Sequence, residues 1–149
     1  MSVELGTARR EDLPQLVALL GVLFAQEAEF VPDDAKQTRA LEKILADDSV
    51  GRIHVARADG KVVAMASLLY SISTAEGGLA ASFEDLVVLP GYRGKGIGSA
   101  LLAHVVEEAK KLGVLRLTLL TDRQNKRAQA VYRKLGFVDS PMKPMRLKL

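Results

Sequence analysis

The segment from Leu86 to Leu112 constrains the fold most, because it joins an apolar run, a glycine-rich turn and an amphipathic helix. Three glycines in the turn let the backbone approach a ligand closely, and Arg93 and Lys95 add positive charge at the same place. The free N–H groups at the start of a helix bind anions, and the helix dipole favours negative charge there. The segment therefore predicts a strand–turn–helix unit that holds a phosphate group.

The helix in this segment is predicted from its apolar spacing. Ile97, Leu101, Val105 and Ala109 recur every four residues, which places them on one buried stripe. Lysines precede Gly113, and both features are typical of a helix C-terminus. We therefore expect a helix over residues 97–112.

The turn does not fit the two best-known phosphate-binding loops. A dinucleotide fingerprint would need glycine where Ser99 stands, and a P-loop would need Ser or Thr directly after its Gly-Lys pair. The spacing that is present, Arg93-x-x-Gly96-x-Gly98, resembles the acetyl-CoA-binding motif of the GNAT superfamily of N-acetyltransferases. A plain tight turn with solvated Arg and Lys is the structural alternative.

A second motif strengthens the resemblance. The run from Asn125 through Ala128 and Tyr132 to Gly136-Phe137 is similar to the N-x-x-A-x-x-x-Y-x-x-x-G-F signature of the same superfamily. Both motifs occur in the family's order, and the expected elements agree with the family from about residue 3 to 149. The resemblance implies a GNAT-like fold with acetyl-CoA in a cleft beside the fourth and fifth strands.

The element pattern predicts one α/β (α+β) domain over residues 1–149, with a mixed central sheet of about six to seven strands and about four helices. A strand–helix–strand unit around the turn indicates that the fourth and fifth strands are parallel. Asp59-Gly60 indicates a hairpin turn. The expected strands are 3–8, 52–57, 61–73, 81–89, 114–121, 137–138 and 145–149, and the expected helices are 13–26, one after Asp33 or Asp34, 97–112 and 126–135.

Composition excludes several kinds of chemistry. The chain has no cysteine, so disulfides, thiolate metal sites and an acyl-cysteine intermediate are excluded. His54 and His104 lie fifty residues apart, and we expect no metal site.

No apolar run is long enough to cross a bilayer, and the N-terminus lacks a signal-peptide core. These features favour a soluble, cytoplasmic protein with no membrane partner.

Charge is distributed unevenly along the chain. Residues 1–89 hold 8 Lys and Arg against 14 Asp and Glu, whereas residues 90–149 hold 13 against 4. A basic C-terminal half suits the phosphates of CoA, and an acidic N-terminal half suits a cationic amine. With aromatic residues at only 5%, and neither zinc spacing nor a long basic run, we expect no nucleic-acid partner.

The resemblance also assigns residues to the cofactor. In the family the pantetheine arm of the cofactor pairs with the fourth strand, the pyrophosphate binds the amides of the turn, and an asparagine contacts the arm. The residues at these positions are Leu86, Val87, Val88, Arg93, Gly94, Lys95, Gly96, Ile97, Gly98, Ser99 and Asn125.

Catalysis requires a base, because an ammonium group must lose a proton before it attacks a thioester. The neighbouring Glu84 and Asp85 lie near the end of the fourth strand, and alternation along a strand lets only one of them face the cleft directly. We expect Glu84 to be the base, with Asp85 as the second choice and a surface ion pair as the alternative for both. A backbone N–H of Val87 or Val88 is the candidate oxyanion donor. The resemblance implies that Tyr132 protonates the departing thiolate, although its helical position also suits a core tyrosine.

The sequence leaves the acceptor open. We expect direct transfer of an acetyl group to a small cationic amine in a ternary complex, because acidic residues precede the second helix. Acetylation of a protein N-terminus or lysine, and a non-catalytic CoA sensor, are the alternatives. A homodimer joined through the C-terminal strand also stays open. The acidic residues that hint at a cation are Glu27, Glu29, Asp33, Asp34 and Glu76, and those before the second helix suit helix capping and solubility equally well.

Overall fold

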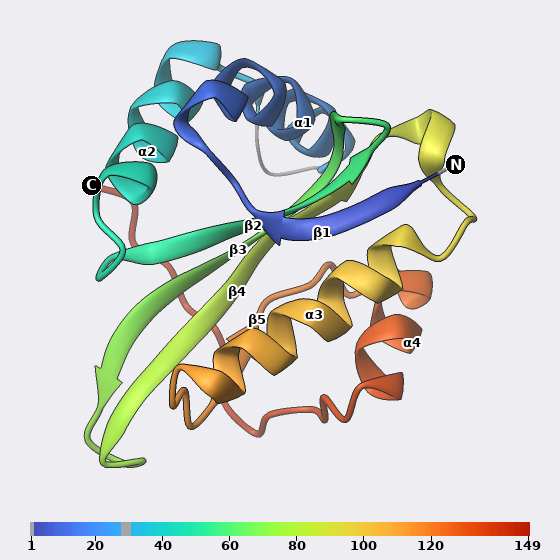
Figure 1. Ribbon diagram of the computed structural model, residues 1–149. Coiled ribbons are helices and arrows are strands. Elements are labelled where there is room, and N and C mark those ends of the chain that lie inside the picture. The colour runs from blue at the N-terminus through green and yellow to red at the C-terminus, as the bar shows by residue number, and fades with distance from the viewer. Residues whose placement is uncertain (1, 28–30) are drawn as a thin grey trace.

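The computed structural model describes residues 2–27 and 31–149, so Glu29 lies outside the described residues. Strands and helices follow the order that the sequence predicts (Figure 1). The elements are β1 (Val3–Thr7), η1 (Arg10–Asp12), α1 (Leu13–Gln26), α2 (Asp34–Ala46), β2 (Gly51–Ala58), β3 (Lys61–Ser73), β4 (Gly78–Val88), η2 (Pro90–Tyr92), α3 (Ile97–Lys111), β5 (Leu117–Leu119) and α4 (Lys126–Lys134).

One mixed sheet forms the centre of the molecule, with its strands in the order β1-β2-β3-β4-β5. Neighbouring strands are antiparallel except for β4 and β5, which are parallel as the strand–helix–strand pattern predicts. Helices α1 and α2 cover one face, and α3 and α4 cover the other (Figure 1). The predicted α/β class is confirmed, with five strands in the described residues instead of six or seven.

Two apolar clusters fill the space between the layers. On the α1 and α2 side, Leu16, Leu19 and Leu41 pack on Val55 and Met65 of the sheet. On the other side, the predicted stripe of α3 packs against Leu68 and Phe83. The stripe residues Ile97, Leu101, Val105 and Ala109 are all buried. Because β4 is covered on both faces, its position relative to α1 and α3 is fixed.

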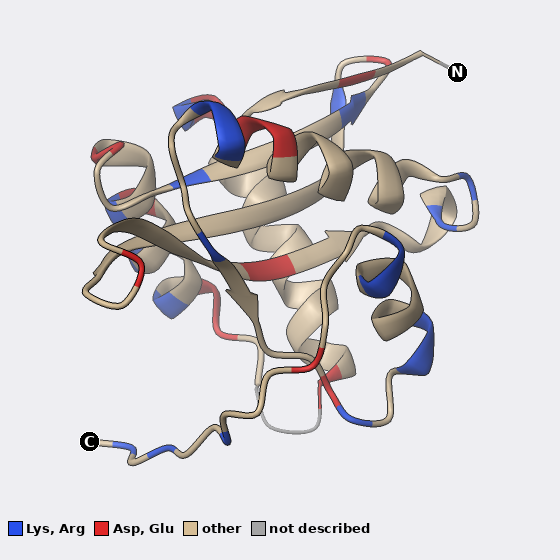
Figure 2. Ribbon diagram, turned by 90° about the horizontal axis from the view of Figure 1, so that it is seen from below, with Lys and Arg blue, Asp and Glu red and all other residues tan. Residues whose placement is uncertain are grey.

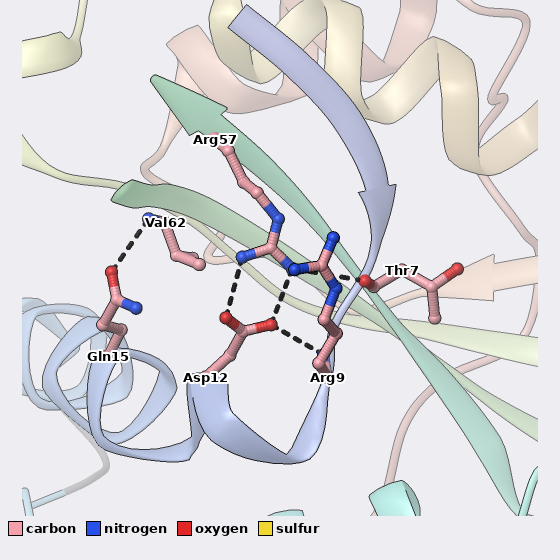
Figure 3. A network of polar contacts seen from close by, with 6 residues as sticks. All are labelled: Thr7, Arg9, Asp12, Gln15, Arg57 and Val62. Carbon is pink, nitrogen blue, oxygen red and sulfur yellow. Dashed lines mark hydrogen bonds and ion pairs between the residues drawn. The ribbon is translucent and has the colours of Figure 1, made fainter. Parts of the chain in front are cut away.

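A buried ion pair anchors the start of α1 to the sheet (Figure 3). The Asp12 carboxylate accepts two hydrogen bonds of 2.7 Å from the guanidinium of Arg57 and one of 2.6 Å from the Arg9 N–H. One turn later, the Gln15 side chain accepts from the N–H of Val62, next to an irregularity in the β2–β3 pairing. These contacts set the direction in which α1 crosses the sheet, and therefore where its C-terminal end lies.

The C-terminal part of the chain differs from the sequence prediction. Only residues 117–119 of the predicted strand 114–121 are assigned to β5, and residues 137–138 and 145–149 form no strand. The tail runs away from the body of the molecule in Figure 2, and Val138, Met145 and Leu147 are exposed. Alternating residues form a strand only when a partner strand pairs with them, and Pro141 and Pro144 interrupt this stretch.

Candidate functional site

The two central strands separate where the sequence places the cofactor. The pairing of β4 with β5 covers only Ala81 to Phe83, whereas β4 continues to Val88. In the described part of the chain, the edge of residues 84–88 that follows this pairing therefore faces no strand. Leu86, Val87 and Val88, predicted to bind the cofactor arm, lie along this open edge, while β3 pairs with the other edge of the strand. Such an edge can accept an extended amide chain as an additional strand.

The glycine-rich turn has the backbone geometry of an anion site. Gly94 and Gly96 adopt positive φ angles of 75° and 80°, which favour glycine, and Gly96 is the N-cap of α3. The Ala100 N–H donates to the Gly96 carbonyl at 3.0 Å. The N–H groups of Ile97, Gly98 and Ser99 come before this first helical bond, and so have no partner within the helix.

The three glycines of the turn differ in function. A Cβ atom added at Gly94 or Gly96 would meet no atom within 4 Å, so the space above both residues is open. A Cβ at Gly98 would lie 3.3 Å from Cγ2 of Val88, so this glycine lets α3 pack closely on the end of β4. Two glycines thus leave room for a ligand, and the third brings the helix to the strand.

The two basic side chains of the turn also differ. The Lys95 ammonium lies 5.8 Å from the centre of the Tyr92 ring, and its side chain is exposed. The Arg93 Nε donates to the carbonyl of Val88 at 2.9 Å. The guanidinium of Arg93 is therefore engaged by the protein itself, which the sequence pattern does not predict.

The two candidate bases occupy different environments. Glu84 is exposed, whereas Asp85 is half-buried. Between the pairs Ser67–Glu84 and Met65–Val87, Asp85 and Leu86 together face one residue of β3, which makes a β-bulge. Asp85 has a φ of 58°, an uncommon conformation for a residue other than glycine. Burial, with smaller contributions from the charges of Glu84 and Glu27, raises the pKa of Asp85 to about 6.

Tyr132 reaches the same region from α4. Its ring contacts Phe83 of β4 at 6.2 Å and Phe137 at 5.9 Å between ring centres, in edge-to-face geometry. Burial, followed by the negative charge of Glu27, raises the pKa of the Tyr132 hydroxyl above its ordinary value. Tyr132 is therefore a core-packing tyrosine as well as the predicted acid, and its hydroxyl keeps its proton at neutral pH.

Glu27 connects these groups. It caps the C-terminal end of α1 and is half-buried. Burial, followed by the charge of Asp122, raises the pKa of Glu27. The same carboxylate acts on Asp85 and on Tyr132, so the end of α1 lies close to both candidate catalytic residues. The sequence singles out Glu27 only as one of several acidic residues. Its position near the candidate catalytic residues Asp85 and Tyr132 depends on the fold.

The other predicted residues have identifiable local contacts. Asn125 is the N-cap of α4, where its Oδ1 accepts from the Ala128 N–H at 3.1 Å. Asp33 caps α2, and Glu76 lies 3.8 Å from Arg116 in an ion pair. His54 and His104, far apart in sequence, have ring centres 5.7 Å apart. Within residues 2–27 and 31–149, no group of three metal-ligating side chains occurs.

Over the described ranges, no helix has the length and apolar character needed to cross a membrane. The arrangement as a whole is typical of a class of protein that binds a phosphate-bearing, extended ligand: a glycine-rich turn at a helix N-terminus, an open strand edge between two parallel strands, a half-buried carboxyl group and a tyrosine.

Comparison with known proteins defines this class further. Residues 18–137 match the acetyltransferase (GNAT) family. The chain therefore belongs to the acetyltransferase (GNAT) family and is an acetyl-CoA-dependent N-acetyltransferase.

Individual relatives agree with this assignment. An uncharacterised N-acetyltransferase of Mycobacterium tuberculosis is 32% identical over 80% of this chain and 72% of its own. The aminoalkylphosphonate N-acetyltransferase of Salmonella typhimurium is 31% identical over 92% of this chain and 86% of its own.

Solved structures show the same fold. An integron cassette protein from the metagenome of a salt marsh has a TM-score of 0.85 at 31% identity, covering 97% of this chain and 90% of its own. A predicted acetyltransferase of Clostridium acetobutylicum, solved with acetyl-CoA, has a TM-score of 0.78 at 21% identity, covering 99% and 96%.

Proposed function

We propose that the protein transfers the acetyl group of acetyl-CoA directly to the primary amine of a small cationic molecule while both substrates are bound. The observation that carries the proposal is the position of Asp85, a half-buried carboxyl group with a pKa of about 6, on the part of β4 that extends beyond its pairing with β5. A base with such a pKa is deprotonated at neutral pH and can accept the proton of an ammonium group.

The residues present fit acetyl-CoA. The open space above Gly94 and Gly96, with the free N–H groups of Ile97, Gly98 and Ser99, suits the pyrophosphate. The unpaired edge at Leu86 and Val87 suits the amides of the pantetheine arm. When bound, the cofactor supplies an activated acyl carbon. Lys95 would add a positive charge beside the pyrophosphate. The side-chain amide of Asn125 would contact the cofactor arm.

Asp85 is the proposed base, in place of Glu84, which the sequence favours. Glu84 is exposed, whereas burial raises the pKa of Asp85 to about 6, in the range where general bases work well. The bulge changes the alternation of side chains on which the choice of Glu84 depends. Proton transfer to Asp85 takes place directly or through one water molecule.

Two further groups complete the proposed mechanism. The backbone N–H of Val87 or Val88 donates to the oxygen that becomes negative during attack. The Tyr132 hydroxyl keeps its proton at neutral pH, as an ordinary tyrosine does and as its raised pKa reinforces, and it donates this proton to the sulfur that leaves. A small cationic acceptor is favoured because Glu27, Glu84, Asp85 and Asp122 give this region negative charge.

The proposal is tested with a panel of amines and acetyl-CoA, by measuring the thiol that is released. We expect turnover with at least one small cationic amine, and lines that intersect when both substrate concentrations are varied. The panel contains polyamines, aminoalkylphosphonates, and peptides with a free N-terminus or lysine. Turnover with peptides only would change the acceptor class to protein. CoA binding in calorimetry without any turnover would indicate a sensor, and parallel kinetic lines would exclude direct transfer.

A further inference from the structure

The side chain of Arg93 connects three elements. Its Nε donates to the carbonyl of Val88, the last residue of β4, at 2.9 Å. With the Gln26 amide turned so that its oxygen faces the guanidinium, this oxygen accepts from Nη1 at 3.2 Å and from Nη2 at 2.7 Å. Gln26 is the last residue of α1, and Arg93 itself ends the short helix η2. One guanidinium thus joins α1, β4 and the glycine-rich turn.

This contact lies directly before Glu27. The backbone leaves the helix at Glu27, which has φ −89° and ψ 136°. Gln26 is therefore the last helical residue before Glu27, and a contact that fixes Gln26 also fixes the point from which Glu27 leaves α1. Glu27 is close enough to Asp85 and Tyr132 for its charge to act on both.

We infer that Gln26 and Arg93 form a positioning clamp, which holds the end of α1 against β4 so that the Glu27 carboxylate stays beside Asp85 and Tyr132. The inference rests on the proposed function in that Asp85 is the base. Gln26 and Arg93 act by positioning the Glu27 carboxylate, and neither of them contacts the reacting atoms.

The geometry favours this role for Arg93 over direct binding of phosphate. Its guanidinium already donates to two acceptors of the protein, at distances typical of good hydrogen bonds. Anion binding in the turn has other donors, namely the free N–H groups at the start of α3 and the Lys95 ammonium. A planar guanidinium can reach a backbone carbonyl and an amide oxygen at the same time, which a lysine ammonium cannot do with the same geometry.

The charged groups that act on Asp85 come from two elements. Glu84 is its neighbour on β4, and Glu27 comes from the end of α1. Glu27 is itself influenced by Asp122, in the loop before α4. Of these charges, the one on Glu27 depends on where α1 ends, so a change that releases α1 removes a negative neighbour of Asp85 and leaves Glu84 in place.

The test measures the pKa of the Asp85 carboxyl group in the free protein by NMR titration, which requires no acceptor. Gln26→Met keeps the length of the side chain but removes the oxygen that Arg93 contacts. We expect the pKa of Asp85 to fall by about 0.5 or more in this variant, because Glu27 is no longer held nearby. Gln26→Glu keeps the acceptor oxygens, and should not lower the pKa of Asp85.

Two controls separate the clamp from a general effect. Ala25→Met places the same side chain one residue earlier on the exposed side of α1, and should leave the pKa of Asp85 unchanged. Glu27→Gln should lower this pKa on its own. The double variant Gln26→Met with Glu27→Gln should then show no further decrease, because Gln26 acts through Glu27.

The NMR titrations test the clamp independently of the enzyme assay. An unchanged pKa of Asp85 in Gln26→Met, or additive decreases in the double variant, would overturn it even if the wild-type protein is an active acetyltransferase. In an active protein, the acidic limb of the pH–rate profile should move to lower pH in Gln26→Met and in Arg93→Lys. CoA affinity in calorimetry should stay the same in Gln26→Met. If no amine is acetylated, the proposed function fails, while the NMR titration still tests the clamp.

Discussion

Two neighbouring carboxylates on β4 differ in what they can do, and the difference arises from one backbone irregularity. The bulge at Asp85 and Leu86 gives Asp85 a positive φ angle and a half-buried carboxyl group, while Glu84 stays in solvent. A strained residue at a functional position is often held there by the surrounding structure. At the scale of single residues, proton transfer is therefore expected to depend on Asp85 much more than on Glu84.

Asp85→Asn removes the proposed base with little change in volume. We expect kcat to fall by about 10²- to 10⁴-fold, the usual contribution of a general base. In the wild-type protein, kcat/KM should fall as the pH is lowered through about 6, because Asp85 is protonated below its pKa. The matched variant Glu84→Gln should keep most of the activity. A larger loss in Glu84→Gln than in Asp85→Asn would return the role of base to Glu84.

Tyr132→Phe tests the proposed acid without disturbing the packing. The phenyl ring can keep the edge-to-face contacts with Phe83 and Phe137, so we expect thermal stability to change little. Loss of the hydroxyl should lower kcat strongly, by about 10²-fold or more, and leave CoA affinity in calorimetry nearly unchanged. Unchanged turnover would remove Tyr132 from the mechanism.

At the scale of elements, the accuracy of the sequence prediction depends on whether a pattern is local. The helix α3 and the turn before it are predicted well, because four apolar residues at regular spacing and three glycines lie within one continuous segment. The strand at 145–149 has an equally regular alternation, but a strand also needs a partner, and the local pattern contains no information on that partner.

The same reasoning explains the site. Both cofactor motifs are continuous in sequence, and the glycine geometry agrees with them. Two other contacts join residues that are far apart in the sequence. Gln26 contacts Arg93, 67 positions later, and Glu27 approaches Asp85, 58 positions later. No periodic or compositional pattern in the sequence predicts either contact. The choice between Glu84 and Asp85 depends on a bulge, and the alternation rule assumes a regular strand.

The buried ion pair between Asp12 and Arg57 joins the start of α1 to β2 (Figure 3). Asp12→Ala leaves the Arg57 guanidinium without its partner and the Arg9 N–H without its acceptor. We expect the free energy of unfolding to fall by about 3–5 kcal/mol in denaturant titrations. The control Glu107→Ala removes an exposed contact with Lys110 and should change it by less than about 0.5 kcal/mol. Equal effects of the two substitutions would show that the buried pair has no special role.

At the scale of the whole molecule, the buried His54 and the half-buried Asp85 make opposite contributions to the stability of the fold in acid. Burial, with smaller contributions from His104 and Arg52, lowers the pKa of His54 to about 4, and neither ring nitrogen has a hydrogen-bond partner among the residues that the structure describes. The unfolded chain binds a proton at His54 below about 6.5, so this residue lowers stability as the pH falls from 6.5 to 4. Asp85 has a raised pKa, so in the same range it increases stability as the pH falls.

The two contributions should nearly cancel in the wild-type protein, because each shift is about two pH units or slightly more, at most roughly 3 kcal/mol. We expect the free energy of unfolding in urea to change little between pH 6.5 and pH 4. His54→Leu removes the histidine term, so its stability should rise as the pH falls over this range. Asp85→Asn removes the carboxyl term, so its stability should decrease. Asp12 interferes little, because its pKa is lowered from 3.8 and its stabilising contribution is lost mainly below pH 4. Slopes of the same sign in the two variants would show that these groups do not control the acid stability of the fold.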